Sequence, residues 1–162
     1  MPFAAALSEH PVPAYAAAVA ELAGALGMGD AVELAGSVTP DDLAARYRAA
    51  DVFVCLSDHE GFCFPLLEAM HHGVPVVAFD AGAVADTARS AAVVLADKAP
   101  AVVATAVHRV VTDRTLRAAV VEAGRARLAT FDLEKTKTRY VDTIAGVIAP
   151  PVSVRGAQMV DR

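Results

Sequence analysis

The sequence has no tryptophan, only two cysteines among its 162 residues and no lysine before Lys98. Cys55 and Cys63 cannot form a disulfide framework or a four-ligand zinc site on their own, so no metal is expected. Charged residues interrupt every apolar stretch well before about 18 residues, which excludes a membrane span. The net charge of −5 excludes a protein that binds nucleic acid through a basic face.

The chain is nevertheless rich in material for a folded core. Hydrophobic residues make up 56% of the sequence, and its length fits one domain, since compact domains usually hold about 100–200 residues. The first residues, MPFAAALSEHPVP, have no basic region and only a short apolar run, so they do not form a secretory signal. These features indicate a cytoplasmic, mildly acidic protein.

The period of the apolar residues alternates between helical and strand-like along the chain. Helices are expected over 14–26, 40–50, 65–72, 99–112, 114–129 and 132–148, and strands over 31–35, 51–56, 74–79 and 91–96. The continuous apolar runs are typical of parallel strands buried on both faces. This order predicts an α/β fold with a Rossmann-like, doubly wound parallel sheet. The domain is expected over 14–148, after a disordered segment or remnant strand at 1–13 and before a flexible tail at 149–162.

Several residues predict where individual helices begin and end. Thr39 is a good N-cap for a helix that starts at Pro40, and two aspartates follow in the first turn, where the helix dipole favours negative charge. Gly27 is expected to end the helix over 14–26. Gly73 is expected to end a short helix that opens at Pro65.

In a doubly wound sheet, ligands bind beyond the carboxyl ends of the strands. This rule places the functional site on the loops 57–64 and 80–87. Both follow apolar strands and are rich in small and polar residues.

The segment EGFCFPLLE carries two glutamates, Glu60 and Glu68, with seven residues between them. With Pro65 in the first helical position, the N–H groups of Leu66, Leu67 and Glu68 are expected to lack intrahelical acceptors and to form an anion site. The two acids would then face opposite ends of a sugar–diphosphate–nucleoside. The alternative is that both are solvated acids, worth ~0.3–1 kcal/mol through the helix dipole.

The chain over residues 14–148 resembles the C-terminal, nucleotide-binding half of the family 4 glycosyltransferases of the GT-B fold, also grouped as glycosyl transferases group 1. The resemblance rests on the segments ADVF, EGFCFPLLEAMHHGVPVVA and a downstream GAV, in this order. It implies a retaining hexosyltransferase-like enzyme whose donor is a nucleotide-activated sugar, without a metal or other cofactor.

The resemblance also implies roles for individual residues. Glu60 and Glu68 are the catalytic glutamates of the family's motif, the first contacting the donor sugar and the second the ribose. The donor-binding positions are Gly61, Phe62, Cys63, Phe64, Leu66 and Leu67, with the amides of residues 61–63 at the sugar and those of Leu66 and Leu67 at the diphosphate. Leu66 and the region 34–38 would border the base.

The sequence departs from the family pattern in three ways. Cys63 stands where many relatives have glycine, so its side chain must point away from the sugar, and Ala85-Asp86 replaces a common Pro-Glu. The third departure is the expectation that the chain is N-terminally truncated. It has neither the acceptor-binding domain nor the strand and helix with the basic pair that clamps the diphosphate. We therefore expect weak nucleotide binding and little transfer by the chain alone.

Two alternatives from other classes follow from the same residues. A non-catalytic module would complete its sheet with a second copy of the chain or with a separate acceptor-binding partner, because exposed strand edges invite pairing. The second, a flavodoxin-like regulatory domain, fails because it needs a cluster of acidic residues at the strand ends, and Asp80 is nearly alone there.

Overall fold

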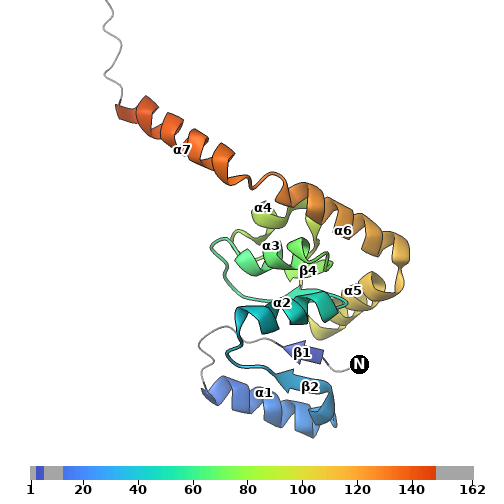
Figure 1. The fold of residues 1–162 in the computed structure, drawn as a ribbon. Coiled ribbons are helices and arrows are strands. Elements are labelled where there is room, and N and C mark those ends of the chain that lie inside the picture. The colour runs from blue at the N-terminus through green and yellow to red at the C-terminus, as the bar shows by residue number, and fades with distance from the viewer. Residues whose placement is uncertain (1–2, 6–12, 149–162) are drawn as a thin grey trace, which may run out of the picture.

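The computed structural model describes residues 3–5 and 13–148 (Figure 1). The flexible tail predicted for 149–162 lies outside the described residues, as do residues 1–2 and 6–12. The elements are β1 (Phe3–Ala5), α1 (Pro13–Ala25), η1 (Gly29–Ala31), β2 (Val32–Leu34), α2 (Pro40–Ala49), β3 (Phe53–Cys55), α3 (Phe64–His71), β4 (Val76–Phe79), α4 (Val84–Ala88), η2 (Arg89–Ala91), β5 (Val93–Leu95), α5 (Pro100–Thr112), α6 (Arg114–Leu128) and α7 (Leu133–Ile148).

All strand pairs in the described part of the chain are parallel, as predicted. Hydrogen bonds join them into two groups, β1–β2 and β3–β4–β5, rather than into one continuous sheet. In Figure 1 the pair β1–β2 lies with α1 at one end of the molecule, and the group containing β4 lies with α3, α4 and α6 at the other. The three-stranded group carries the loops predicted to form the site.

Strand β4 is the centre of the fold because it is covered on both faces. Val76 and Ala78 point into a core formed with α2, α3 and α4, whereas Val77 points into a second core with α5. All three side chains are fully buried. This arrangement is the doubly wound architecture that the apolar run over 74–79 predicts.

Strand β3 is less buried than predicted. Its three residues are half-buried, since β3 pairs only with β4 and its other edge carries no strand among the described residues. The prediction of a loop over 80–87 is also partly wrong. Its second half forms the short helix α4, in which Val84, Thr87 and Ala88 are buried.

Most predicted helix ends are confirmed. The Thr39 hydroxyl accepts a hydrogen bond from the Asp42 N–H at 3.2 Å, and Pro40 opens α2. Gly27 and Gly73 follow α1 and α3 with φ of +67° and +70°. Such left-handed values strain a residue with a Cβ atom, which is why glycine suits both positions.

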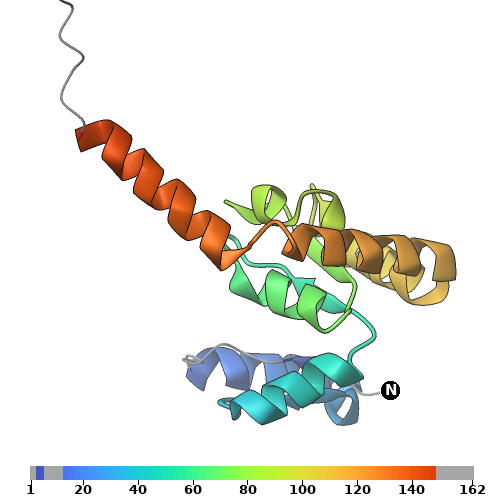
Figure 2. The ribbon, with the colours of Figure 1, turned by 45° about the horizontal axis from the view of Figure 1, so that its top comes forward.

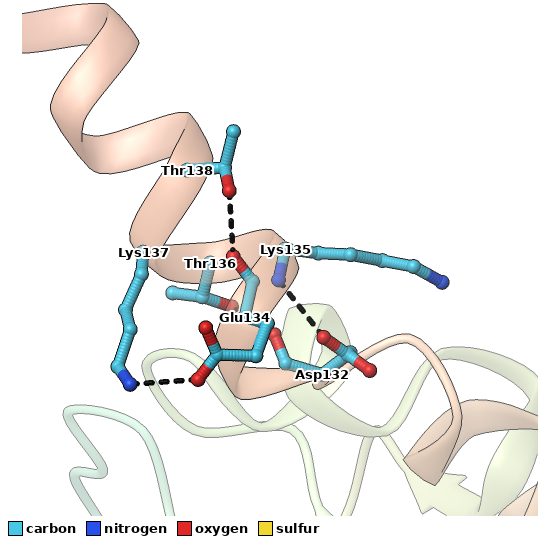
Figure 3. Close-up of polar contacts among 6 residues, drawn as sticks. All are labelled: Asp132, Glu134, Lys135, Thr136, Lys137 and Thr138. Atoms are coloured by element: carbon cyan, nitrogen blue, oxygen red, sulfur yellow. Dashed lines mark hydrogen bonds and ion pairs between the residues drawn. The ribbon is translucent and has the colours of Figure 1, made fainter.

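Helix α7 projects away from the other elements, with no buried residue along its length (Figure 2). Asp132 directly precedes it, and the Asp132 carboxylate accepts the Lys135 N–H at 2.8 Å (Figure 3). Glu134 and Lys137 form an ion pair of 2.7 Å one turn further on. Local capping and charge pairs therefore define α7, rather than packing against the core. No helix in the described ranges is both long and apolar enough to cross a membrane.

We expect Leu66→Ala to lower the free energy of unfolding by roughly 2–5 kcal/mol, because the Leu66 side chain is fully buried and its loss leaves a cavity. Urea denaturation measures the change. The matched control, Leu22→Ala, removes a side chain that is 60% exposed and should change stability by less than about 0.5 kcal/mol. Equal losses in the two variants would contradict the core described above.

Candidate functional site

The site predicted on two loops lies at the carboxyl ends of β3 and β4, where the structure brings these loops together. The Ala83 N–H donates to the carbonyl oxygen of Glu60 at 2.9 Å. Parallel strands end at the same edge of a sheet, and Cys55 is in register with Ala78. The loop that carries Glu60 is thereby attached to the loop after β4.

Gly82 makes this attachment possible. A Cβ atom at residue 82 would lie 2.3 Å from the carbonyl oxygen of Glu60 and 3.0 Å from its nitrogen. Real Cβ atoms do not come this close to backbone, and Gly82 also has a φ of +56°. Position 82 therefore requires glycine for two separate reasons, the positive φ and the close contact with Glu60. The close contact fixes where the Glu60 backbone lies.

Helix α3 begins one residue earlier than predicted. Cys63 is its N-cap, with a left-handed φ of +62°, Phe64 is the first helical residue and Pro65 the second. The Leu66 N–H donates back to the Cys63 carbonyl at 3.1 Å. The Leu67 and Glu68 N–H groups come after the first turn, where the carbonyls of residues 63 and 64 are their helical partners.

The expectation that Leu66, Leu67 and Glu68 supply free N–H donors is therefore wrong. The groups without an intrahelical partner are the N–H groups of Cys63 and Phe64. Among the described residues, neither they nor the N–H groups of Gly61 and Phe62 donate to a protein acceptor. The Leu66 side chain is fully buried, so it cannot border a base. The candidate anion site consists of the amides over 61–64.

Glu68 is held by a tyrosine that the sequence analysis did not identify. The Tyr47 hydroxyl, from α2, donates to Glu68 Oε2 at 3.0 Å. Burial, together with this contact to a carboxylate, raises the pKa of Tyr47, so the phenol stays a hydrogen-bond donor at any ordinary pH. Its ring stacks on His72, with ring centroids 5.4 Å apart. The exposed carboxylate of Glu68 thus has a fixed position.

Glu60 lies about half-buried at the other end of the segment. Its Oε1 is 3.8 Å from Cys55 Sγ, and Cys55 Sγ is 3.7 Å from Cys63 Sγ. Cys63 is almost fully buried, so its side chain points into the core. Burial raises the pKa of the Cys63 thiol to about 12. No hydrogen bond among the described residues joins Glu60 to Glu68, and each is positioned by different neighbours.

A lysine also reaches this edge of the sheet. Lys98 follows β5 and forms an ion pair with Asp58 in the loop after β3. Its Nζ lies 5.2 Å from the centre of the Phe79 ring. The first arginine of the chain, Arg46, is paired with Glu33 instead.

Two exposed aromatic rings border the candidate anion site. Phe62 is 37% exposed and Phe64 67% exposed, and their ring centroids are 4.8 Å apart. Phe62 also meets Phe131 edge to face, and the Arg127 guanidinium lies over the Phe131 ring. The amides over 61–64 therefore lie beside an apolar surface that a planar ligand could cover.

Two hollows of the surface lie elsewhere. One of about 650 Å³ is an open strip along α7, and one of about 590 Å³ lies between β5, α5 and α6. Neither includes a residue of the loops 57–64 and 80–87. The candidate site thus lies on the two loops and the start of α3, apart from both of these hollows.

Comparison with solved structures identifies the fold. The chain superposes on Anabaena HepE, solved in complex with UDP and glucose, with a TM-score of 0.74 and 20% identity; the match covers 83% of this chain and 37% of that one. The architecture is therefore that of half of a GT-B glycosyltransferase, as the resemblance implied.

Comparison of sequences identifies the family. Residues 14–127 match the family model "Glycosyl transferases group 1", and the chain belongs to that family. It is 34% identical over 131 residues to a D-inositol 3-phosphate glycosyltransferase of Salinispora arenicola, a match covering 80% of this chain and 29% of the relative. It is 58% identical over 40 residues to a GDP-mannose-dependent alpha-mannosyltransferase of Mycolicibacterium smegmatis, covering 25% and 11%. The chain thus spans less than a third of the length of these relatives.

We expect Gly82→Ala to destabilise the protein by more than Gly36→Ala. Both glycines have a positive φ, but a Cβ at residue 36 would meet no atom within 4 Å. The loss of stability in Gly36→Ala therefore measures the conformational cost alone, about 1–2 kcal/mol. The additional loss of stability in Gly82→Ala measures the steric conflict with the Glu60 backbone. Urea denaturation of both variants gives the comparison. Equal losses would show that Gly82 does not position Glu60.

Proposed function

We propose that this chain binds a nucleoside-diphosphate sugar at the carboxyl edge of β3 and β4 and forms the donor half of a retaining glycosyltransferase. The observation that carries the proposal is the fixed carboxylate of Glu68, held by Tyr47 next to the free amides that open α3. The complex of HepE with UDP and glucose, and the GDP-mannose dependence of one relative, support a nucleotide sugar as the ligand class.

The leaving diphosphate would lie at the N-terminus of α3. The amides of Cys63 and Phe64 lack intrahelical acceptors, and the helix dipole adds about half a positive charge there. Negative charge grows on the diphosphate as the bond to the sugar breaks. Donors already pointing at that position stabilise the transition state without having to reorganise. Transfer by this arrangement needs no metal or other cofactor.

The two glutamates would bind opposite ends of the donor. Glu68 accepts one hydrogen bond from Tyr47 and keeps the rest of its acceptor capacity for the ribose hydroxyls. Glu60, in the loop attached to Gly82, would orient the hydroxyls of the sugar, with the amides of Gly61 and Phe62 as donors to the same group. Residue Leu67 has no direct role in this arrangement, since its amide lies inside the helix.

The acceptor would bind to residues outside this chain, since the chain matches only 29% of the length of a relative. We therefore expect the isolated chain to bind nucleotides weakly and to transfer sugar poorly. Efficient transfer by the purified chain would contradict this part of the proposal.

Replacing Glu68 tests the ribose contact. Hydrogen bonds to charged groups contribute about 1.5–3 kcal/mol, so Glu68→Ala should raise the Kd for a nucleoside diphosphate by roughly 10–150-fold. Calorimetric titration with UDP, GDP and ADP measures this and ranks the nucleosides. Glu134→Ala, on the projecting helix α7, is the control and should leave the Kd unchanged. Binding that survives in Glu68→Ala would remove Glu68 from the site.

Replacing Tyr47 tests whether Glu68 must be held in place. Tyr47→Phe removes a hydrogen bond to a charged group, which contributes about 1.5–3 kcal/mol in all. The carboxylate itself stays, so nucleotide binding should weaken by less than in Glu68→Ala, roughly 2–10-fold. In a Glu68→Ala background the same change should have no effect, because the carboxylate it positions is gone. Tyr140→Phe, at a position that is 68% exposed, is the matched control. Additive losses in the double variant would show that Tyr47 acts on binding by another route.

A further inference from the structure

Three potential metal ligands converge where β3 passes through the loop into α3. Cys55 ends β3, Glu60 lies in the loop, and Cys63 is the N-cap of α3. One ligand atom from each lies within 4.8 Å of the other two. Two cysteines alone are too few for a metal site, but the fold adds a carboxylate to the pair.

The spacing of these atoms fits a tetrahedral ion. Zinc binds thiolate sulfur at about 2.3 Å and carboxylate oxygen at about 2.0–2.2 Å. Two sulfurs bound to one tetrahedral ion are then about 3.8 Å apart, and a sulfur and an oxygen about 3.6 Å. The distance between the two Sγ atoms is 3.7 Å, and Cys55 Sγ lies 3.8 Å from Glu60 Oε1. These two distances already match one ion, and the third pair, Cys63 Sγ and a Glu60 carboxylate oxygen, lies within 4.8 Å.

Cys63 gives a second, independent argument. Its φ of +62° is left-handed, a conformation that costs a residue with a Cβ about 1–2 kcal/mol and that glycine adopts freely. Core packing of the thiol explains why Cys63 is buried, but it does not explain why a carboxylate lies beside the two sulfurs. Strain of this kind at a cluster of polar groups is the pattern that ligand sites show.

We propose that Cys55, Glu60 and Cys63 bind a divalent cation of the zinc class, with the fourth position open to water. Two sulfur ligands favour zinc, cadmium or cobalt over magnesium and calcium, which prefer all-oxygen sites. The ion must displace the proton of each thiol, against the burial that raises the pKa of Cys63, so binding should tighten as the pH rises.

This site shares Glu60 with the proposed donor site. In the proposed function, Glu60 also orients the donor sugar. On that basis the bound ion and the sugar compete for one carboxylate. Zinc then inhibits donor binding instead of assisting transfer.

The test measures metal binding without nucleotide, so its outcome does not depend on the proposed function. Titration with Co²⁺ under a phosphine reductant should give one ion per chain and a sulfur-to-cobalt charge-transfer band, which Zn²⁺ then removes. Zn²⁺ should also protect both cysteines from alkylation. The variants Cys55→Ser and Cys63→Gly should each lower the affinity at least 100-fold, and Glu60→Gln at least tenfold.

Cys63→Gly is the decisive variant because glycine fits the left-handed backbone, so a loss of binding does not reflect unfolding. His108→Ala, an exposed histidine outside the cluster, should bind as the original protein does. A missing charge-transfer band, or a band that persists in Cys63→Gly, overturns the proposal.

Discussion

The close approach of Gly82 to the backbone of Glu60 is the constraint on which the rest of the site depends. β3 and β4 lie in register, so the loops that leave them must pass side by side at the same edge. They can do so only where one of them has no Cβ. The Glu60 backbone attached in this way lies three residues before the left-handed turn at Cys63, from which α3 begins. One loop contact therefore lies next to both the carboxylate of Glu60 and the amides that open α3.

Tyr47 connects the site to the core in a different way. Its ring packs against Phe53 and His72, while its hydroxyl reaches Glu68 at the surface. The place of an exposed carboxylate thus depends on how α2 packs against α3. Changes in the core on that side of the sheet would move a group at the ligand edge, so stability and binding are coupled through one side chain.

Local signals in the sequence predicted much of the fold, whereas contacts between distant residues could not be predicted. The caps at Thr39 and Gly27 depend on neighbours in the chain and were confirmed. α3 begins one residue earlier than Pro65 predicts because Cys63 is its N-cap, with a left-handed backbone that a non-glycine residue does not signal. Tyr47 and Lys98 lie far from their partners in sequence, at ordinary positions of their helix and loop. The roles assigned to Glu60 and Glu68 stay predictions that the geometry makes specific.

Helix α7 has consequences for how the protein opens. Since none of its residues is buried, its amides are protected from solvent exchange only by the helix itself, and isolated helices of this length are marginal in water. β4, covered on both faces, exchanges only when the whole domain unfolds. Among the described segments, α7 and β4 should thus lie at opposite ends of the range of opening free energies. A protease would accordingly cut within α7 long before it reached the sheet.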